Sequence, residues 1–300
     1  NDWGDWLSAG PPTPKELGAT AMFAHSTDLV ARMARALGRD SDAQYYRGLF
    51  QKIRKAFEEK YVNTNGTVSG DGDVQGSYAL ALHFGLLDEP LKSRAAARLM
   101  QLVRENKNHP TTGFWSSVEL LLALSESDYN DEAALMLDQQ SEPSWGYMAD
   151  HGTTLWEAFD ANARNLSLNH WTHSAVNEWF WRNVAGLNPN EHLPGYQSFT
   201  ICPQPTAEVS WCRATYNSIR GPIIIDWHRD GDIFDLKISV PANTTAIVVV
   251  RAIDPGTVKE SGKPATQAEG VKLISTRPRV VTFQVGSGNY HFTSRMPPST

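Results

Sequence analysis

Residues 173–202 read HSAVNEWFWRNVAGLNPNEHLPGYQSFTIC, and the chain changes its structural pattern within this stretch. Up to about residue 185 the apolar residues are spaced as on one face of a helix. Pro189 then interrupts the pattern, and from about residue 196 apolar and polar residues alternate as in a strand. We therefore expect a helical domain over residues 1–189 and a β domain over residues 190–300.

Helical periodicity covers most of the first domain. Pro14 stands where the first turn of a helix tolerates proline, and Gly38 follows that helix as a stop signal. Short connections favour antiparallel packing of sequential helices, and repeated pairs indicate a helical toroid or solenoid without a fixed repeat length. The expected helices run from Pro14 to Leu37, from Asp40 to Phe57, and over about 74–86, 90–105, 115–125, 130–139 and 173–185.

Strands with period-two alternation fill the second domain. Aliphatic and β-branched residues dominate them, and Asp230-Gly231 is a tight hairpin signal. Short strands at this spacing are typical of an antiparallel sandwich. The expected strands are Ser198–Cys202, Glu208–Tyr216, Pro222–His228, Ile233–Val240, Thr245–Arg251 and Arg279–Val285.

Composition excludes several classes of protein. The 300 residues carry a net charge of -6 with no basic run, which argues against a nucleic-acid partner. No apolar run reaches the length of about 18 residues that a membrane helix needs. Two cysteines are too few for a disulfide scaffold or a cysteine-based zinc site. Neither a nucleotide-binding glycine loop nor a GxSxG elbow is present, so no cofactor is expected. The 10 tryptophans are many, and an indole stacks well on a sugar ring.

The stretch from Pro143 to Glu157, PSWGYMADHGTTLWE, combines glycine, tryptophan and hydroxyl residues more densely than a simple core helix would. A carboxylate among aromatic rings suits a general base that activates water beside a sugar, and Glu157 is that carboxylate. The alternative is that Glu157 caps or pairs locally. Trp145 and Trp156, in the same stretch, are candidate sugar contacts.

Further candidates lie in three aromatic clusters. His170, in Ser167-Leu168-Asn169-His170-Trp171, could bind a sugar hydroxyl or orient the carboxylate. His173 follows at helical spacing, so the two histidines could both contact a metal ion. No third ligand stands at a convincing spacing, so a metal site is not expected. Trp3, Asp5 and Trp6 form a second cluster and Gly113-Phe114-Trp115 a third. In a toroid the loops at one rim converge on a central pocket, which these residues would line; alternatively, the tryptophans seal helix ends.

At these residues the sequence resembles the α-L-rhamnosidases of bacteria and fungi, a family of inverting glycoside hydrolases. The stretches that carry the resemblance span the helical region and enter the β domain. They are Gly4-Asp5-Trp6-Leu7, QGSYALALHFGL over 75–86, TTGFW over 111–115, PSWGYMADHGTTLWE over 143–157, SLNHWTHSAVNEW over 167–179, and 195–205.

The resemblance implies an (α/α)6 barrel followed by a C-terminal β-sandwich, and removal of terminal α-L-rhamnose from glycosides. The family's general base is the Glu of a TTxWE motif, which falls on Glu157 here. The His of its SLNH motif falls on His170, a sugar contact. Asp5 and Trp6 carry a GDW motif that lines the pocket.

Two departures from the family pattern matter. The family usually has WERW where this chain has Trp156-Glu157-Ala158-Phe159, so an Arg and a Trp near the base are absent. The family's general acid lies upstream of the GDW motif, so these 300 residues are expected to lack it and to be inactive alone. Asp2 and Asp5 are poor substitutes because neither lies in the acid motif. An incomplete barrel would expose apolar helix faces that favour self-association or packing on the missing upstream part.

Other interpretations stay open at the level of sequence. Another (α/α)6 enzyme, such as a glucoamylase-like or trehalase-like hydrolase, is the alternative activity, and a truncated sugar-binding homologue is the non-enzymatic one. Cys202 and Cys212 could form a disulfide or remain free thiols. The sequons at Asn65, Asn165 and Asn243 are close to chance in number, so the compartment stays open between secretion and the cytoplasm.

Overall fold

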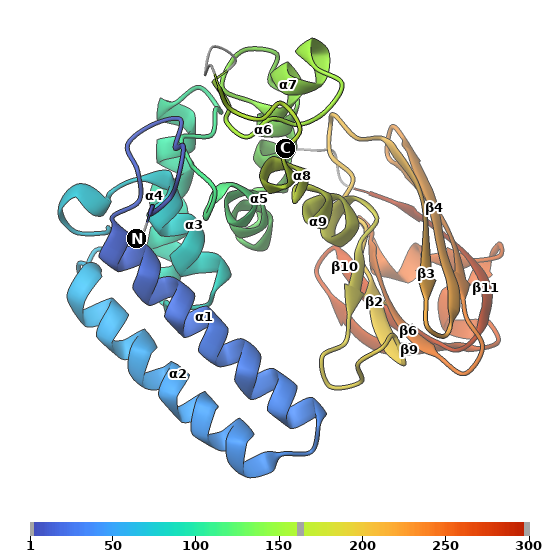
Figure 1. Cartoon of the computed structure of the whole chain (residues 1–300). Helices are drawn as coiled ribbons and strands as arrows, with labels where there is room; N and C mark the ends of the chain where they lie inside the picture. Colours follow the sequence, from blue (N-terminus) through green and yellow to red (C-terminus); the bar gives the residue numbers. More distant parts are fainter. Residues whose placement is uncertain (1–2, 161–164, 297–300) are drawn as a thin grey trace. The chain divides into compact units, whose positions relative to one another are not determined.

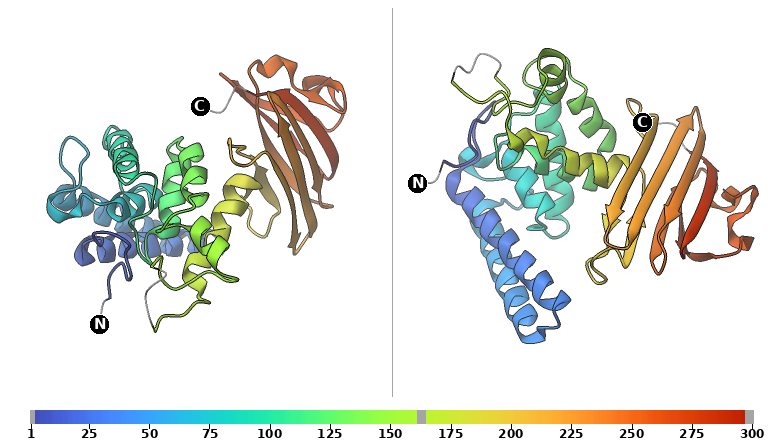
Figure 2. Two further views of the ribbon diagram at one scale, coloured as in Figure 1. Left: turned by 90° about the horizontal axis from the view of Figure 1, so that it is seen from above. Right: turned by 45° about the vertical axis from the view of Figure 1, so that its right-hand side comes forward.

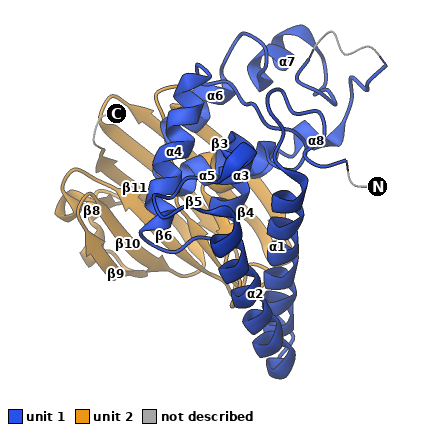
Figure 3. Ribbon diagram, turned by 90° about the vertical axis from the view of Figure 1, so that its left-hand side faces the viewer, with its two compact units in different colours: residues 1–178 blue, residues 179–300 orange. Residues whose placement is uncertain are grey.

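A computed structural model describes residues 3–160 and 165–296 and divides the chain into two compact units, residues 1–178 and 179–300 (Figure 3). The first unit is helical and the second contains the β-sheets, so the predicted order of a helical part and a β part is confirmed. Each unit is described by itself. Among the described residues, no helix combines the length and the apolar character that crossing a membrane requires.

The helices of the first unit follow one another along the chain, with a long connection between α7 and α8 (Figure 1). They are α1 (Lys15–Ala36), α2 (Asp40–Tyr61), η1 (Gly70–Gly72), α3 (Gln75–His83), α4 (Leu91–Glu105), α5 (Ser117–Glu126), α6 (Asn130–Leu137), α7 (Trp145–His151), α8 (Trp171–Ser174) and α9 (Asn177–Trp179).

The core of the helical unit lies around α3 and α5. Both helices carry small and aliphatic residues on almost every side, and nearly all of them are buried. A helix that is apolar all round must be covered on all sides, which is why these two helices lie side by side in the middle. By contrast α2 buries one stripe, with Phe50, Ile53 and Phe57 toward the core and charged residues on the other face.

The first helix, α1, has two apolar faces. One is rich in alanine and buried, with Leu17, Ala24 and Ala31 as examples, and packs beside α2 (Figure 1). The other face is exposed and carries Phe23, Leu29, Met33 and Leu37, whose exposed fractions run from 38% to 73%.

The predicted helices differ from the structure at two places. The single helix expected over 173–185 is divided into α8, α9 and a π-helical turn, η2 (Phe180–Val184). Conversely, the glycine-rich stretch after Pro143 does form a helix, α7, because Ser144 caps it by accepting the Tyr147 N–H over 2.9 Å.

The second unit contains two sheets, whose strands run side by side (Figure 2). Their strands are β1 (Leu187–Pro189), β2 (Ser198–Ile201), β3 (Trp211–Ser218), β4 (Gly221–Asp230), β5 (Ile233–Val240), β6 (Thr245–Arg251), β7 (Lys259–Glu260), β8 (Lys263–Pro264), β9 (Val271–Arg277), β10 (Val280–Val285) and β11 (Gly288–Arg295); η3 (Pro255–Thr257) and η4 (Ala265–Gln267) are short turns.

The six predicted strands are present, and the Asp230-Gly231 turn joins β4 to β5. One sheet has the order β1-β2-β6-β10-β9 and the other β3-β4-β5-β11-β7-β8. The pairing is antiparallel except between β2 and β6, which are parallel. The sequence analysis missed β1, β7, β8, β9 and β11, which are short or carry polar residues on many positions.

Aromatic side chains fill the space between the two sheets. Phe283 of β10 and Phe292 of β11 stack with ring centroids 5.6 Å apart. Trp227 is fully buried, and its indole N–H donates to the Val184 carbonyl over 2.8 Å, which ties β4 to η2. Cys202 and Cys212 are free thiols, and burial raises the pKa of each.

Candidate active site

Two motifs that were singled out in the sequence pair with each other in the structure. The Glu157 N–H donates to the Ser167 carbonyl and the His170 N–H donates to the Leu155 carbonyl, each over 2.9 Å. The Thr154 hydroxyl also donates to the Leu168 carbonyl. Residues 154–157 and 167–170 therefore form one short antiparallel ribbon, which brings the predicted base and the predicted histidine together.

The ribbon also orients the Glu157 side chain. The carboxylate is half-buried, and its Oε2 accepts the Ser167 N–H over 2.9 Å. An ionised carboxylate has about four acceptor positions. One hydrogen bond therefore fixes the orientation of the group and leaves capacity to bind and deprotonate a water molecule. This local pairing, which was the alternative in the sequence analysis, is thus compatible with a general base.

His170 is held in one orientation by the helix that it caps. Its Nδ1 lies 3.3 Å from the Thr172 nitrogen, which donates to it, and 2.8 Å from the Thr172 hydroxyl oxygen. An Nδ1 that accepts a hydrogen bond places the proton of the neutral ring on Nε2. The ring lies between Phe114 and Trp171, at centroid distances of 5.2 and 5.7 Å. His170 therefore offers an N–H donor beside two aromatic rings.

His173 is a buried support under the ribbon. Its Nδ1 lies 2.9 Å from the Trp156 carbonyl oxygen, to which it donates, and its own carbonyl accepts the Trp145 indole N–H over 3.1 Å. Burial lowers the pKa of His173 to about 4, so the ring is neutral at pH 7. Within residues 3–160 and 165–296, no group of three or more His, Cys, Asp or Glu side chains is arranged to hold a metal ion.

The tryptophans of the two motifs differ from the sequence prediction, which placed them against the sugar. Trp145 and Trp156 are both buried. Trp145 packs edge-on against Phe159 at 4.9 Å, and Trp156 packs edge-on against Tyr147 at 6.2 Å. Both indoles therefore support the backbone around Glu157 from inside the unit.

Asp5 is likewise a structural residue in this fold. Asp5 is 4% exposed, so its carboxylate is closed to a ligand, although the GDW motif was expected to line the pocket. One oxygen accepts the hydroxyls of Thr13 and Ser116 over 2.9 and 2.5 Å, and the other accepts the Trp115 N–H over 2.9 Å. Gly76 lies against this cluster, because a Cβ there would come within 2.2 Å of the Thr13 hydroxyl oxygen.

Trp6 and Trp115 keep exposed surface. Both are half-buried. The Trp6 carbonyl accepts the Phe114 N–H over 2.9 Å, so the GDW and TTGFW segments lie side by side. The Trp115 ring packs on α1 at Gly18, where a Cβ would come within 2.7 Å of the ring. These two indoles, with His170, are the predicted sugar contacts that a ligand can reach.

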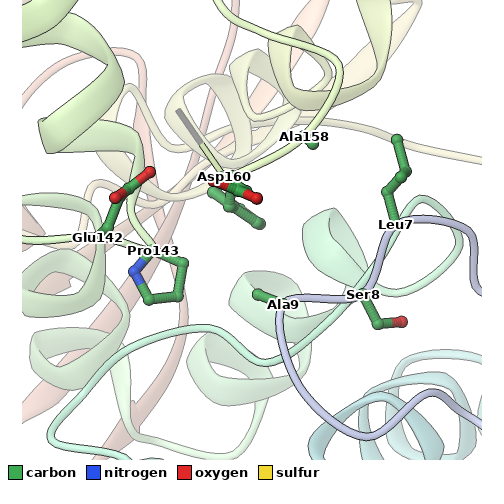
Figure 4. Close-up of a pocket in the computed structure, with 8 residues that line it drawn as sticks. Leu7, Ser8, Ala9, Glu142, Pro143, Ala158 and Asp160 are labelled. Carbon is green, nitrogen blue, oxygen red and sulfur yellow. The ribbon is translucent and has the colours of Figure 1, made fainter. Parts of the chain in front are cut away.

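A cavity of about 420 Å³ lies between the segment after Trp6 and the two ends of the stretch 143–157 (Figure 4). Three segments line it: the residues directly after Trp6, those directly before Ser144, and those directly after Glu157. Glu157 itself is adjacent in sequence to the lining residue Ala158. Figure 4 shows Leu7 and Ala9 on the opposite side of the cavity from Glu142. The lining residues are Leu7, Ser8, Ala9, Glu142, Pro143, Ala158, Phe159 and Asp160.

The sequence analysis missed three acidic residues of this unit. Glu142 and Asp160 line the cavity, and the only signal for them was their position next to the motifs. Glu119, in the first turn of α5, is largely buried, and burial raises its pKa to about 7. A pKa near 7 suits a general acid, but Glu119 is not part of the cavity lining.

Comparisons with known proteins identify the family of the chain. Residues 1–184 match the model of the bacterial alpha-L-rhamnosidase 6 hairpin glycosidase domain, and residues 186–265 match that of the bacterial alpha-L-rhamnosidase C-terminal domain. The chain belongs to this family. An alpha-L-rhamnosidase of Streptomyces avermitilis is 39% identical over 97% of this chain, and one of Formosa agariphila is 31% identical over 98%.

Solved structures of rhamnosidases have the same fold. The Streptomyces avermitilis enzyme, solved in complex with L-rhamnose, superposes with a TM-score of 0.89 at 38% identity over 98% of this chain. The enzyme from Dictyoglumus thermophilum superposes with a TM-score of 0.87 at 28% identity over 97%. This rhamnosidase-family chain spans only 28% and 34% of those two chains, and 28% and 33% of the two sequence relatives.

Replacement of Asp5 by Asn tests the structural role of this carboxylate. Asp5→Asn leaves either the Trp115 N–H or the Thr13 and Ser116 hydroxyls without an acceptor in a buried site, so we expect the free energy of unfolding to fall by about 3 kcal/mol. The measurement is denaturant unfolding followed by tryptophan fluorescence. Asp71→Asn, at an exposed position, is the matched control and should change stability by less than about 0.5 kcal/mol. Equal losses in both variants would contradict the assignment.

The pKa of His173 predicts a pH dependence of stability. Because the folded-state pKa of about 4 lies below the ordinary value of 6.5, the unfolded chain takes up the proton first as the pH falls. Between pH 7 and pH 5 this group should lower the free energy of unfolding by about 2 kcal/mol.

Unfolding curves at both pH values measure this loss. In His173→Gln the loss between pH 7 and pH 5 should shrink by that amount. In His192→Gln, which changes an exposed histidine, it should not shrink. An unchanged pH dependence in His173→Gln would show that this histidine is not the group that titrates.

Proposed function

We propose that this chain is part of a glycoside hydrolase that removes terminal α-L-rhamnose from glycosides with inversion, and that Glu157 is its general base. The observation that carries the proposal is the ribbon of residues 154–157 and 167–170, which holds the Glu157 carboxylate and His170 in one place. The family membership and the relatives named alpha-L-rhamnosidase support rhamnose as the sugar.

The reaction assigns a separate task to each group. Glu157 takes a proton from water as the water oxygen forms a bond to the anomeric carbon. The bond between that carbon and the glycosidic oxygen breaks, and a carboxylic acid on the other side of the sugar gives its proton to the leaving oxygen. The two carboxyl groups of an inverting enzyme lie about 6.5–9.5 Å apart, which leaves room for the water. The Nε2–H of His170 donates to a sugar hydroxyl, and Trp6 and Trp115 contact the ring.

The general acid, in this proposal, comes from outside these 300 residues. The resemblance places it upstream of Gly4-Asp5-Trp6, and the chain spans about a third or less of the relatives that it matches. Asp5 is buried with three hydrogen bonds, which makes it a poor acid for a sugar. Asp2, the other carboxylate considered as a substitute, lies outside the described residues.

The exposed face of α1 supports a second part of the proposal, which concerns partners. We propose that Phe23, Leu29, Met33 and Leu37 pack against another helical segment in the complete barrel. In the isolated 300-residue chain the same face would associate with a second copy, because contiguous apolar surface of this kind is rarely left open in monomers.

Hydrolysis of p-nitrophenyl α-L-rhamnoside tests the catalytic assignment. The 300-residue chain alone is expected to be inactive, and the longest natural polypeptide that contains it is expected to be active. Glu157→Gln in that polypeptide should lower kcat by about 10²–10⁴-fold, as for loss of a general base, whereas Glu208→Gln at an exposed position should not. NMR of the first product should show the inverted anomer.

Each alternative outcome has a distinct meaning. Activity of the chain alone that Glu157→Gln abolishes would contradict an external acid, and Glu142 and Asp160 in the cavity would become the residues to replace next. Full activity of Glu157→Gln in the longer polypeptide would contradict the base assignment.

Sedimentation of the isolated chain tests the partner surface. We expect a dimer or larger species at micromolar concentration that Phe23→Ser with Met33→Ser converts to monomer, because the two serines remove the centre of the apolar face. Leu273→Ser, which changes an exposed apolar residue of β9, is the matched control. A monomer before any substitution would contradict this part of the proposal.

A further inference from the structure

A second cavity, of about 410 Å³, lies on the outer face of the six-stranded sheet in the C-terminal unit. Its floor consists of two rows of outward side chains on three neighbouring strands. In the first row Ile224 of β4 pairs with Ser239 of β5, which pairs with Asn289 of β11. In the second row Asp226 of β4 pairs with Lys237 of β5, which pairs with His291 of β11.

The alternation of the strands explains why these side chains point away from the core. Ile225 of β4 and Ile238 of β5 are buried and pair with each other. Their sequence neighbours must point to the opposite face, since successive side chains of a strand alternate. The turn between β7 and β8 forms a wall of the cavity, and Ser261 in this turn donates its N–H to the His291 carbonyl over 2.9 Å.

Two of the three titratable groups in the second row have partners. Arg213 Nε donates to Asp226 Oδ2 over 3.1 Å, and His291 Nε2 lies 2.5 Å from Asp235 Oδ2. Lys237 stands between Asp226 and His291 in the register. Because both signs of charge are present in similar number, the floor does not select a charged ligand. Because Asp226 and His291 are already held by Arg213 and Asp235, these two side chains need little ordering when a ligand binds.

The polar groups of this floor match the hydroxyls of a sugar. A pyranose presents hydroxyls that both donate and accept, and the floor offers an ammonium, a carboxylate, an amide and two hydroxyls. The ring also has apolar C–H surface, and Ile224 exposes an apolar side chain in the same cavity. A volume of about 410 Å³ lies within the ordinary range of small-molecule pockets.

An exposed tryptophan lies on the same face of the sheet. Trp211, on the edge strand β3, is 65% exposed and pairs with His228 of β4. His228 and Asp226 are two positions apart on β4, so Trp211 stands on the same side as the cavity floor. The exposed indole of Trp211 offers a flat apolar face on which a sugar ring can stack.

We propose that this outer face, formed by Trp211 and the cavity floor, is a second carbohydrate-binding site that holds neutral sugar units of an oligosaccharide. The cavity takes one sugar unit through Asp226, Lys237 and Asn289, and the Trp211 indole stacks on the next unit. The site performs no hydrolysis, and its role is to retain the saccharide chain on the protein.

Calorimetric titration with a neutral α-L-rhamnose trisaccharide tests this proposal. The titration uses a chain that carries Trp6→Ala, which removes one of the sugar contacts proposed for the candidate active site. We expect binding to persist in this chain. Asn289→Ala or Lys237→Ala, added to it, should weaken the affinity about tenfold, which is the loss expected for one hydrogen bond to a charged or amide group. Trp211→Ala should weaken it similarly.

Matched controls make the result decisive. Lys272→Ala removes an exposed lysine from β9 of the other sheet and should leave the affinity unchanged. Circular dichroism confirms the fold of each variant. No binding in the Trp6→Ala chain, or equal affinity with and without Asn289→Ala, would overturn the proposal. Binding of a galacturonic acid trisaccharide in place of the neutral one would overturn the assignment to neutral sugars. Because no readout depends on hydrolysis, the result is independent of the role of Glu157.

Discussion

The buried carboxylate of Asp5 is the constraint on which the candidate active site depends. It accepts hydrogen bonds from Thr13, Ser116 and the Trp115 backbone, so it joins the N-terminal segment, the entry to α1 and the entry to α5. A carboxylate removed from water needs such partners, and here the partners lie at the N-terminal ends of two helices, α1 and α5. The contact thereby places Leu7, Ser8 and Ala9 in the wall of the first cavity, beside the segments around Glu157.

Much of the fold could be predicted because local pattern and tertiary burial agree. The strands Ile233–Val240 and Thr245–Arg251 alternate strictly between buried and less buried residues, and their predicted bounds equal the observed ones. The pattern failed where few residues of an element are buried, or where a local cap determines the element. Strand β9 is exposed along most of its length, so no apolar period marks it. Helix α7 depends on the Ser144 cap rather than on a periodic face.

From the sequence one could predict which motifs come together, but not which way each side chain faces. Motif spacing identified Glu157 and His170, and the structure brings them together through backbone pairing. Sequence alone could not distinguish an aromatic ring that faces a ligand from one that supports the backbone. Trp145 and Trp156 are buried, while Trp6 and Trp115 retain open surface, and that difference arises from packing between segments far apart in the chain.

The ribbon under Glu157 has a consequence for how such a site can diversify. Its two bonds between main-chain groups, from Glu157 to Ser167 and from His170 to Leu155, do not depend on which side chains lie between them. Leu168 is exposed on this ribbon, and substitutions there alter the surface offered to a substrate without moving the carboxylate. The position of the Glu157 carboxylate and the surface at Leu168 are therefore separable traits, so the surface can drift through substitution while the carboxylate stays in place.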